Sequence, residues 1–265
     1  MFGLDSVYST IVVVWAFLGQ VLRDGKEASC QSAVARIVTH QHQQGRAVPT
    51  HDTGDYCRAR AKLSEAAVHD LATEVAAEVE QRAATAWFWK NRHIKLIDGF
   101  TFTMPDTPAN QAAYPQARTQ KPGVGQPIAR ACAIVSLATG CVLELAAGPY
   151  RGKETGETAL LRELLNSLSA SDVALFDRHY CSFLMLALLL SRGMDVCTRL
   201  HQCRRADFRR GKRLGHDDHL IVWIKPECPE WMDEATYQSL PDQLELRELR
   251  YEVHTPGFRV SRITI

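Results

Sequence analysis

Two aspartates in this sequence stand where an apolar, strand-like run meets polar residues. Asp98 lies within "KLIDGFTFTMPD" (95–106), and Asp177 directly follows "DVALF" (172–176). On neighbouring strands, these two carboxylates would face each other across one strand spacing of about 4.8 Å. Two negative charges at that separation need a cation between them, and Mg²⁺ or Mn²⁺ prefers such oxygen ligands. We therefore predict that Asp98 and Asp177 bind a divalent metal ion.

A simpler role is open to Asp177. An aspartate after a strand often caps the helix that follows, and a helical pattern begins near Tyr180. Taken alone, Asp177 fits a cap better and Asp106 fits a turn better, whereas the pairing of Asp177 with Asp98 favours the metal site. We assign the acids before and within the next helical pattern to its first turn and its surface: Glu154, Glu157 and Glu163.

A basic segment, "RLHQCRRADFRRGKRLG" (199–215), holds seven Lys and Arg residues against the single acid Asp207. A solvated helix face normally mixes the two signs of charge, although that reading remains open. Arginine side chains bind phosphate oxygens in pairs, and affinity grows with the number of phosphates neutralised. We predict contacts to nucleic-acid phosphates from this segment and from the arginine next to Asp177: Arg178, Arg199, Arg204, Arg205, Arg209, Arg210, Lys212 and Arg213.

The elements that would position these residues follow a recognisable order. Residues 95–106 and 128–148 predict three strands joined antiparallel, the last two around the turn at 138–140. Next come a helix at 157–169, a strand at 172–176, a helix at 181–191 and a strand at 194–200, which imply parallel pairing. This β-β-β-α-β-α-β order predicts an α/β (α+β) fold with the mixed sheet of the ribonuclease H-like class.

The first part of the chain is predicted to be all-helical. Apolar residues recur along 11–22, where Ser9 or Thr10 could cap a helix, and Asp52 or Thr53 could cap another. A stripe repeating every four residues predicts a helix with one buried face: Leu63, Ala67, Leu71, Val75 and Val79. We expect a helical domain at 1–88 that contacts DNA or is merely solvated, then a core at 89–265 with a basic insertion at about 201–250.

The composition and net charge of the chain exclude few classes of protein. The net charge of +1 excludes a generally basic nucleic-acid binder, so phosphate affinity must come from local clusters. The apolar run at 11–22 is shorter than the roughly 20 residues that span a bilayer, and no basic region precedes it, so we expect a cytoplasmic chain without a signal peptide. Eight scattered cysteines predict reduced, buried thiols, and the spacing of Cys197, His201 and Cys203 does not favour zinc.

Several stretches resemble the DDE transposases of bacterial insertion sequences, in the insertion-sequence-four family with its Tyr-Arg-Glu-Lys signature. They are "TGDYCRARAKL", "LIDGFTFTMPDTPANQAAYPQ", "FDRHYCSFLMLALLLSRGMDVCTRLHQCRRADFRRGKRLG" and "PGFRV". The resemblance implies that Asp98 and Asp177 are the first two catalytic acids and ligands of Mg²⁺ or Mn²⁺. It also implies cleavage and transfer of DNA strands at transposon ends by a protein that forms a dimer on double-stranded DNA, associates with the nucleoid and binds no membrane.

The family's third acid is a glutamate within Tyr-x2-Arg-x3-Glu-x6-Lys, and no stretch here fits that spacing. Tyr237 and Tyr251 both lack an arginine three residues later, and Glu245, Glu248 and Glu252 lie in a strand-like stretch. We therefore expect a chain truncated at its C-terminus, with one apolar sheet face uncovered and no transposition by this polypeptide alone. The alternatives are a DNA-binding or inhibitory fragment and, less favoured, a ribonuclease H-like nuclease with its own substrate.

Overall fold

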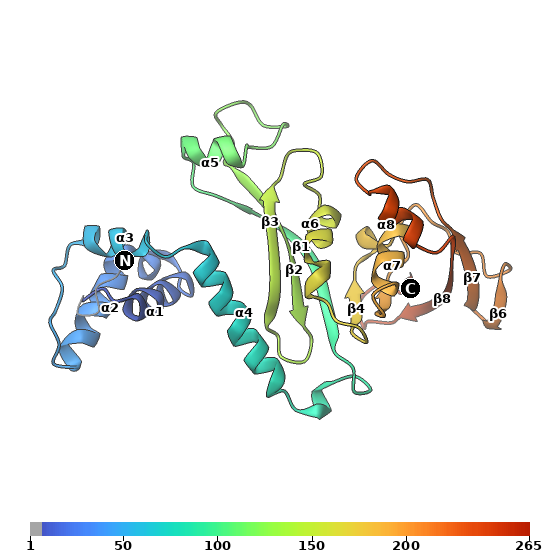
Figure 1. The fold of residues 1–265 in the computed structure, drawn as a ribbon, viewed down its shortest axis with the longest axis horizontal. Coiled ribbons are helices and arrows are strands. Elements are labelled where there is room, and N and C mark those ends of the chain that lie inside the picture. The colour runs from blue at the N-terminus through green and yellow to red at the C-terminus, as the bar shows by residue number, and fades with distance from the viewer. Residues whose placement is uncertain (1–6) are drawn as a thin grey trace. The chain divides into compact units, whose positions relative to one another are not determined.

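The chain folds into two compact units in a computed structural model that describes residues 7–265. The first unit is Met1–Ala72 and the second is Thr73–Ile265. Figure 1 shows the helices of the first unit and the sheets of the second. The division falls inside helix α4 (Glu65–Gln81), so the first turns of this helix belong to one unit and its later turns to the other.

The first unit is helical, as the sequence predicts. Its elements are α1 (Thr10–Val21), η1 (Gly25–Ala28), α2 (Cys30–Gln43), α3 (Thr53–Arg60) and the start of α4. Helices α1, α2 and α3 each contribute one fully buried side chain to the centre of this unit: Val13, Ile37 and Tyr56. Asp52 caps α3 by accepting the Gly54 N–H at 3.0 Å, which confirms one predicted cap, whereas Ser9 precedes α1 without a side-chain bond.

Helix α4 forms where the sequence predicts it, but its apolar stripe is not buried. Leu71, Val75 and Val79 are 42%, 51% and 38% exposed, and Ala76 is the buried residue of this helix. The prediction of a buried face was wrong because periodicity shows which residues share a face, whereas burial requires another element to pack against that face.

The second unit contains a five-stranded mixed sheet in the order β3-β2-β1-β4-β5. The strands are β1 (Ile94–Thr103), β2 (Ile128–Ser136), β3 (Val142–Pro149), β4 (Val173–Phe176) and β5 (Asp195–Thr198). Strands β1, β2 and β3 pair antiparallel, and β4 lies parallel to both β1 and β5. This order confirms the predicted ribonuclease H-like sheet, with η2 (Thr85–Trp87) before β1 and the unpredicted short helix α5 (Pro108–Ala113) between β1 and β2.

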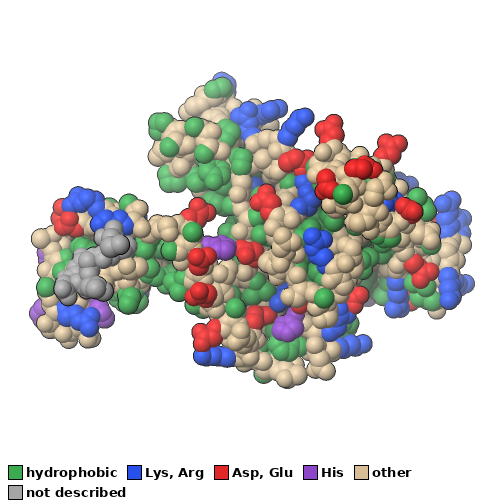
Figure 2. Space-filling view, in the orientation of Figure 1, with side chains coloured by type: hydrophobic (Ala, Val, Ile, Leu, Met, Phe, Trp, Pro, Cys, Tyr) green, Lys and Arg blue, Asp and Glu red, His purple; other side chains and the backbone are tan. Residues whose placement is uncertain are grey.

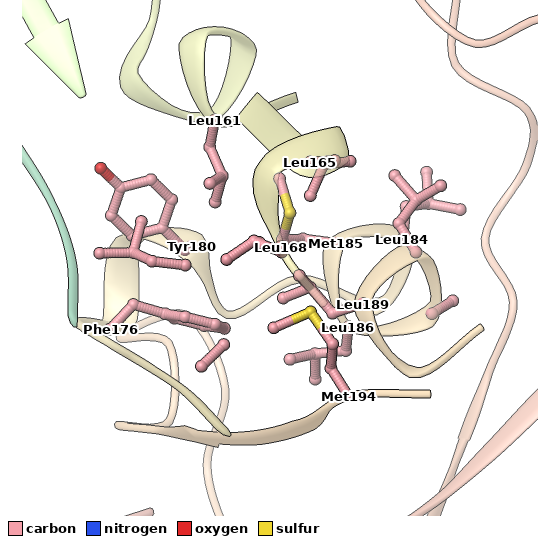
Figure 3. Packing of buried hydrophobic residues seen from close by; sticks show 14 of the residues in the cluster. Leu161, Leu165, Leu168, Phe176, Tyr180, Leu184, Met185, Leu186, Leu189 and Met194 are labelled. Carbon is pink, nitrogen blue, oxygen red and sulfur yellow. The ribbon is translucent and has the colours of Figure 1, made fainter. Parts of the chain in front are cut away.

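Two helices, each next to a short 3₁₀ helix, build the core of the second unit. They are α6 (Glu157–Leu164) with η3 (Leu165–Ser167), and α7 (Phe183–Leu190), which follows η4 (Arg178–Tyr180). Figure 3 shows Leu161 and Leu165 packed towards Leu186 and Leu189, with Phe176 of β4 beside them. Helix α7 is buried on nearly every side, because its sequence "FLMLALLL" has no polar face to present to water.

A second, four-stranded antiparallel sheet begins within the region predicted as a basic insertion at about 201–250 and extends beyond it. Its order is β6-β7-β8-β9, formed by β6 (Lys212–Gly215), β7 (Asp218–Ile224), β8 (Gln243–Val253) and β9 (Ser261–Thr264), with α8 (Glu234–Ser239) between β7 and β8. Trp223 of β7 and Leu244 of β8 belong to the same buried cluster as α7. The two sheets of this unit therefore share one hydrophobic core.

One face of the five-stranded sheet is partly exposed along β1, whereas on β2 the residues opposite Asp98, Phe100 and Phe102 are buried alanines (Ala133, Ala131 and Ala129). Side chains alternate between the two faces along β1, so Phe100 and Phe102 lie on the same side as Asp98. They are 48% and 42% exposed. On the covered side, Ile97 packs into the core formed with α6 and α7. Asp98 is therefore presented on the open side of the sheet.

Two further expectations can be compared with the described residues. All eight cysteines are free thiols, but Cys203 and Cys228 are exposed, so burial was wrongly predicted for these two. Among residues 7–265, the structure has no helix with the length and apolar character needed to cross a bilayer.

Candidate functional site

Asp98 and Asp177 occupy matching positions on neighbouring parallel strands. Ile97 of β1 pairs with Phe176 of β4, so the next residue on each strand is one of the two aspartates. Both side chains are exposed. Because strands in register orient equivalent side chains to the same face, the carboxylates project from one side of the sheet at the point where β4 ends.

Each carboxylate is also oriented by a backbone N–H. Asp177 accepts the His179 N–H at 2.7 Å and caps η4, and Asp98 accepts the N–H of Gly99 at 2.8 Å. The longer helix α7 has its own cap, Ser182, which accepts the Met185 N–H at 3.4 Å. The capping role proposed for Asp177 is therefore correct for the short 3₁₀ helix, and it leaves a carboxylate oxygen free for another ligand.

Glu157 approaches the same strand from the opposite face. A Cβ on Gly99 would lie 2.3 Å from the Cδ atom of Glu157, so the Glu157 side chain packs directly against this glycine. Since Gly99 and Asp98 are consecutive strand residues, their outward directions are opposite. Glu157 begins α6, as predicted, and its Oε1 lies 4.0 Å from Nε of Arg130. It therefore does not join the paired aspartates.

The aspartate pair suits a hard divalent cation in the type and number of donors. Carboxylate oxygens from one or two residues, completed by water and substrate phosphates, are the usual protein contribution to Mg²⁺. The described part of the chain holds no cluster of three or more His, Cys, Asp or Glu arranged for a metal ion. Asp98 and Asp177 therefore offer two carboxylates on neighbouring strands, and no third His, Cys, Asp or Glu joins them within the described residues.

Two arginines flank the second aspartate. Arg178 follows Asp177 in the chain. Arg199 follows Thr198, which pairs with Phe176 across β4 and β5 and donates its hydroxyl to the Asp177 carbonyl at 3.0 Å. The register therefore puts Asp98, Asp177 and Arg199 in a row across three adjacent strands.

A surface groove of about 400 Å³ begins beside this row. We call it the arginine groove, because six of its lining residues are arginines from the segments around η4, β5, β8 and β9. They are Arg178, Arg199, Arg204, Arg205, Arg250 and Arg262. The structure thus brings together four of the arginines predicted from the sequence and adds two that sequence reasoning missed.

The sequence around Arg250 and Arg262 gives no sign that they belong to a basic surface. Arg250 lies in the mixed-charge stretch "LELRELRYEV" and Arg262 in "VSRITI", whereas the other four lie at 178–205. Only strand pairing brings the two together, since Arg250 is opposite Thr264 and Glu252 is opposite Arg262 in the β8–β9 ladder. Their role could be found only from the register of β8 with β9.

The rest of the basic segment lies outside the groove. Arg209 binds Asp207 with two hydrogen bonds, at 2.8 and 3.1 Å, and Nε of Arg210 lies 3.5 Å from the same carboxylate. The hydrogen bonds from Arg209 lower the pKa of Asp207 to about 2. Lys212 and Arg213 are exposed on β6. Figure 2 shows Lys and Arg side chains gathered on the end of the molecule that carries β6 and β7.

A buried polar pair supports the segment that carries the basic residues. Nε2 of His219 on β7 lies 3.0 Å from Oε2 of Glu248 on β8, and its Nδ1 lies 2.7 Å from the Arg210 carbonyl. The Trp223 indole donates to the other oxygen of Glu248 at 3.4 Å. Burial opposes the charged imidazole, but the bonds to Glu248 and the Arg210 carbonyl prevail and raise the pKa of His219. The hydrogen bonds of His219 thus tie the basic segment to both strands.

The chain was compared with known proteins. A family model described as "Transposase DDE domain" matches residues 89–247. "Putative transposase InsZ" of Escherichia coli (strain K12) is 29% identical over 108 residues, which are 40% of this chain and 35% of that protein. "Transposase InsG for insertion sequence element IS4" of the same strain is 26% identical over 165 residues, 62% of this chain and 36% of that protein. The chain spans about a third of the length of these curated relatives.

The raised pKa of His219 predicts that the stability of the second unit depends on pH. The folded value lies above the ordinary 6.5, so the stabilisation is fully present below pH 6.5 and is lost as the pH rises through the folded pKa. The free energy of unfolding, measured by urea titration followed by tryptophan fluorescence, should fall by up to about 1.4 kcal/mol per pH unit within that window.

The double variant His219→Gln/Glu248→Gln removes the titrating pair without leaving a lone buried charge, and it should lose this pH dependence. His216→Gln is the matched control, because His216 lies just before β7 with a side chain 93% exposed. Identical pH dependence in the double variant and in the unaltered protein would contradict the assigned role of His219.

Proposed function

This chain belongs to the transposase DDE-domain family, and from that premise we propose that it binds DNA and positions a phosphodiester for metal-dependent strand cleavage and transfer. The observation that supports this most is the register of β1 with β4, which puts Asp98 and Asp177 side by side on an open sheet face. Both are assigned as catalytic residues and as metal ligands.

Asp98 and Asp177 would hold Mg²⁺ or Mn²⁺, each through the carboxylate oxygen that the neighbouring backbone N–H leaves free. When bound, the ion supplies activation of the attacking oxygen and stabilisation of charge on the phosphoryl group. The chain's own contribution is orientation, since the N–H groups of Gly99 and His179 fix the rotation of both carboxylates before any ligand arrives.

The arginines next to the aspartates would place the DNA. Arg178 follows Asp177 in the chain. Arg199 lies next to Asp177 on the neighbouring strand, because Thr198 pairs with Phe176. Guanidinium groups there would bind phosphate oxygens and hold one phosphodiester over the carboxylates, because such contacts position the backbone without reading sequence. Positioning of this kind accounts for much of the catalysis in phosphoryl transfer.

The remaining assignments follow from the family. We propose double-stranded DNA at transposon ends as the substrate, a dimer assembled on that DNA, association with the nucleoid in the bacterial cytoplasm, and contact of the helical region 1–88 with the same DNA. The division at residues 1–88 and 89–265, with a basic insertion at about 201–250, is part of this proposal.

A second candidate function applies to the 265-residue polypeptide itself: binding of DNA without completed transposition. The observation that favours it is the donor set, since two carboxylates meet on the open sheet face while Glu157 lies on the opposite one. A metal held by only two protein ligands is less precisely placed, and a misplacement of about 1 Å can cost roughly a hundredfold in rate.

Removal of either aspartate should weaken metal binding. Asp98→Asn and Asp177→Asn each leave one carboxylate, so Mn²⁺ affinity, measured by isothermal titration calorimetry, should fall at least about tenfold, in the range typical for altered metal sites. Asp106→Asn is the control, because Asp106 is exposed and lies on the loop after β1. Unchanged Mn²⁺ affinity in both site variants would reject the proposed metal site.

The polypeptide should bind a labelled duplex but yield no strand-transfer product with Mg²⁺ or Mn²⁺, because within residues 7–265 no third carboxylate joins Asp98 and Asp177. Gel analysis of a duplex carrying a free 3′-hydroxyl measures both properties at once. Strand transfer that disappears in Asp98→Asn would show instead that two carboxylates suffice, and it would reject the second candidate function.

A further inference from the structure

We propose that the arginine groove is a single binding site for the phosphate backbone of DNA, in which Arg250 of β8 and Arg262 of β9 contact phosphate together with the arginines near β5. This inference rests on the proposed function and deepens it, because it assigns the surface that leads DNA to the aspartate pair. Nothing in the family match, which ends at residue 247, assigns a role to these two arginines.

The lining of the groove is suited to an anion. Six of its twelve residues are arginines and none is Asp or Glu; the others are Leu200, His201, Gln202, Ala206, Ile263 and Thr264. This part of the surface therefore concentrates positive charge in a protein whose net charge is only +1. Phosphate oxygens are the ligands that guanidinium groups bind in pairs, with short charge-assisted hydrogen bonds.

Four of the six guanidinium groups are available to a ligand. Within residues 7–265, no ion pair with a carboxylate involves Arg178, Arg199, Arg204 or Arg205. Arg250 and Arg262 differ, because Nη1 of Arg250 lies 4.0 Å from Asp217 and Nε of Arg262 donates to Glu252 at 2.8 Å. Nε of Arg250 also donates to the Thr264 hydroxyl at 3.3 Å, so Nη2 of Arg250 and both Nη groups of Arg262 remain for a ligand.

Two aromatic rings hold guanidinium groups in place before DNA binds. The guanidinium carbon of Arg204 lies 3.6 Å from the centre of the Trp223 ring, and that of Arg250 lies 4.6 Å from the centre of the Phe208 ring. Phe208 packs in turn on the buried His219, with ring centres 4.6 Å apart. Arginines stacked in this way lose less conformational entropy on binding a phosphate.

The position of the groove favours a DNA backbone over a small free anion. Arg178 and Arg199 belong both to the groove and to the surroundings of Asp177, so a strand whose phosphates contact Arg250 and Arg262 could continue directly to the aspartates. Six arginines spread over four segments also exceed the needs of one phosphate group. A polymer with a phosphate at each nucleotide uses all of them.

The proposal divides the basic residues into two groups. Arg209 and Arg210 already neutralise Asp207, and they line no part of the groove, as is also true of Lys212 and Arg213. The groove arginines should therefore govern the salt dependence of DNA binding, whereas Arg209 and Arg210 should contribute little. The pair Arg209 and Arg210 is thus a natural control, with the same charge and a nearby position.

The test is fluorescence anisotropy of a labelled 20-base-pair duplex, titrated with the full chain in EDTA at several NaCl concentrations. In Arg250→Gln/Arg262→Gln the slope of log Kobs against log [salt] should become shallower by about 2, since each lost phosphate contact removes about 0.9. Arg204→Gln/Arg205→Gln should give a similar change. Arg209→Gln/Arg210→Gln should keep the slope of the unaltered chain.

The proposal is overturned if Arg250→Gln/Arg262→Gln retains the original slope, or if the control pair loses as much as the groove pair. Should the β8–β9 variant fail to fold, as judged by circular dichroism, the unaltered chain can be treated with phenylglyoxal with and without duplex and digested for mass spectrometry. Protection of Arg250 and Arg262 by DNA, with Arg209 and Arg210 still modified, supports the groove; the reverse pattern rejects it.

A failure of the groove proposal can be distinguished from a failure of the proposed function. The anisotropy is measured without metal, and the groove variants leave Asp98 and Asp177 in place, so their Mn²⁺ affinity should equal that of the unaltered chain. Loss of DNA binding with normal Mn²⁺ binding confirms the groove alone. Absence of Mn²⁺ binding with a normal salt slope refutes the metal site while the groove stands.

Discussion

The parallel, in-register pairing of β1 with β4 is the constraint on which the rest of the site depends. It fixes Ile97 opposite Phe176, and so brings Asp98 beside Asp177 across one strand spacing although 79 residues separate them in sequence. The pairing is held by the buried side chains of the opposite face, where Ile97 and Phe176 pack against α6 and α7. A slip of one residue would turn one carboxylate into that core, at a prohibitive cost in desolvation.

Opposite charges meet at the end of these strands for a physical reason. A pair of carboxylates is stable only if cations balance it, and phosphate binding needs cations that no carboxylate has already neutralised. The register of β4 with β5 satisfies both needs by placing Arg199 next to Asp177. The second sheet then extends the positive surface with Arg250 and Arg262, while the buried His219 and Glu248 hold its strands in place.

The sequence predicts the strands and their order well, because each strand of the first sheet is a short apolar run bounded by turn residues. The adjacency of Asp98 and Asp177 was predictable for the same reason, since each ends or interrupts such a run and the predicted order makes the two strands neighbours. The burial of α4 was wrongly predicted, because Leu71, Val75 and Val79 share a face that is exposed in the described structure. Arg250 and Arg262 were not predictable, because only the pairing of β8 with β9 brings them to the groove.

The most direct test of the paired aspartates is to locate the bound metal ion on the chain. Fe²⁺ in place of Mg²⁺, with ascorbate and hydrogen peroxide, cleaves backbone next to the ion that it replaces. The paired site predicts two cuts, one near Asp98 and one near Asp177, both suppressed by excess Mg²⁺. Cleavage at one position only, or at Cys197–Cys203 instead, would contradict the claim that β1 and β4 build one metal site.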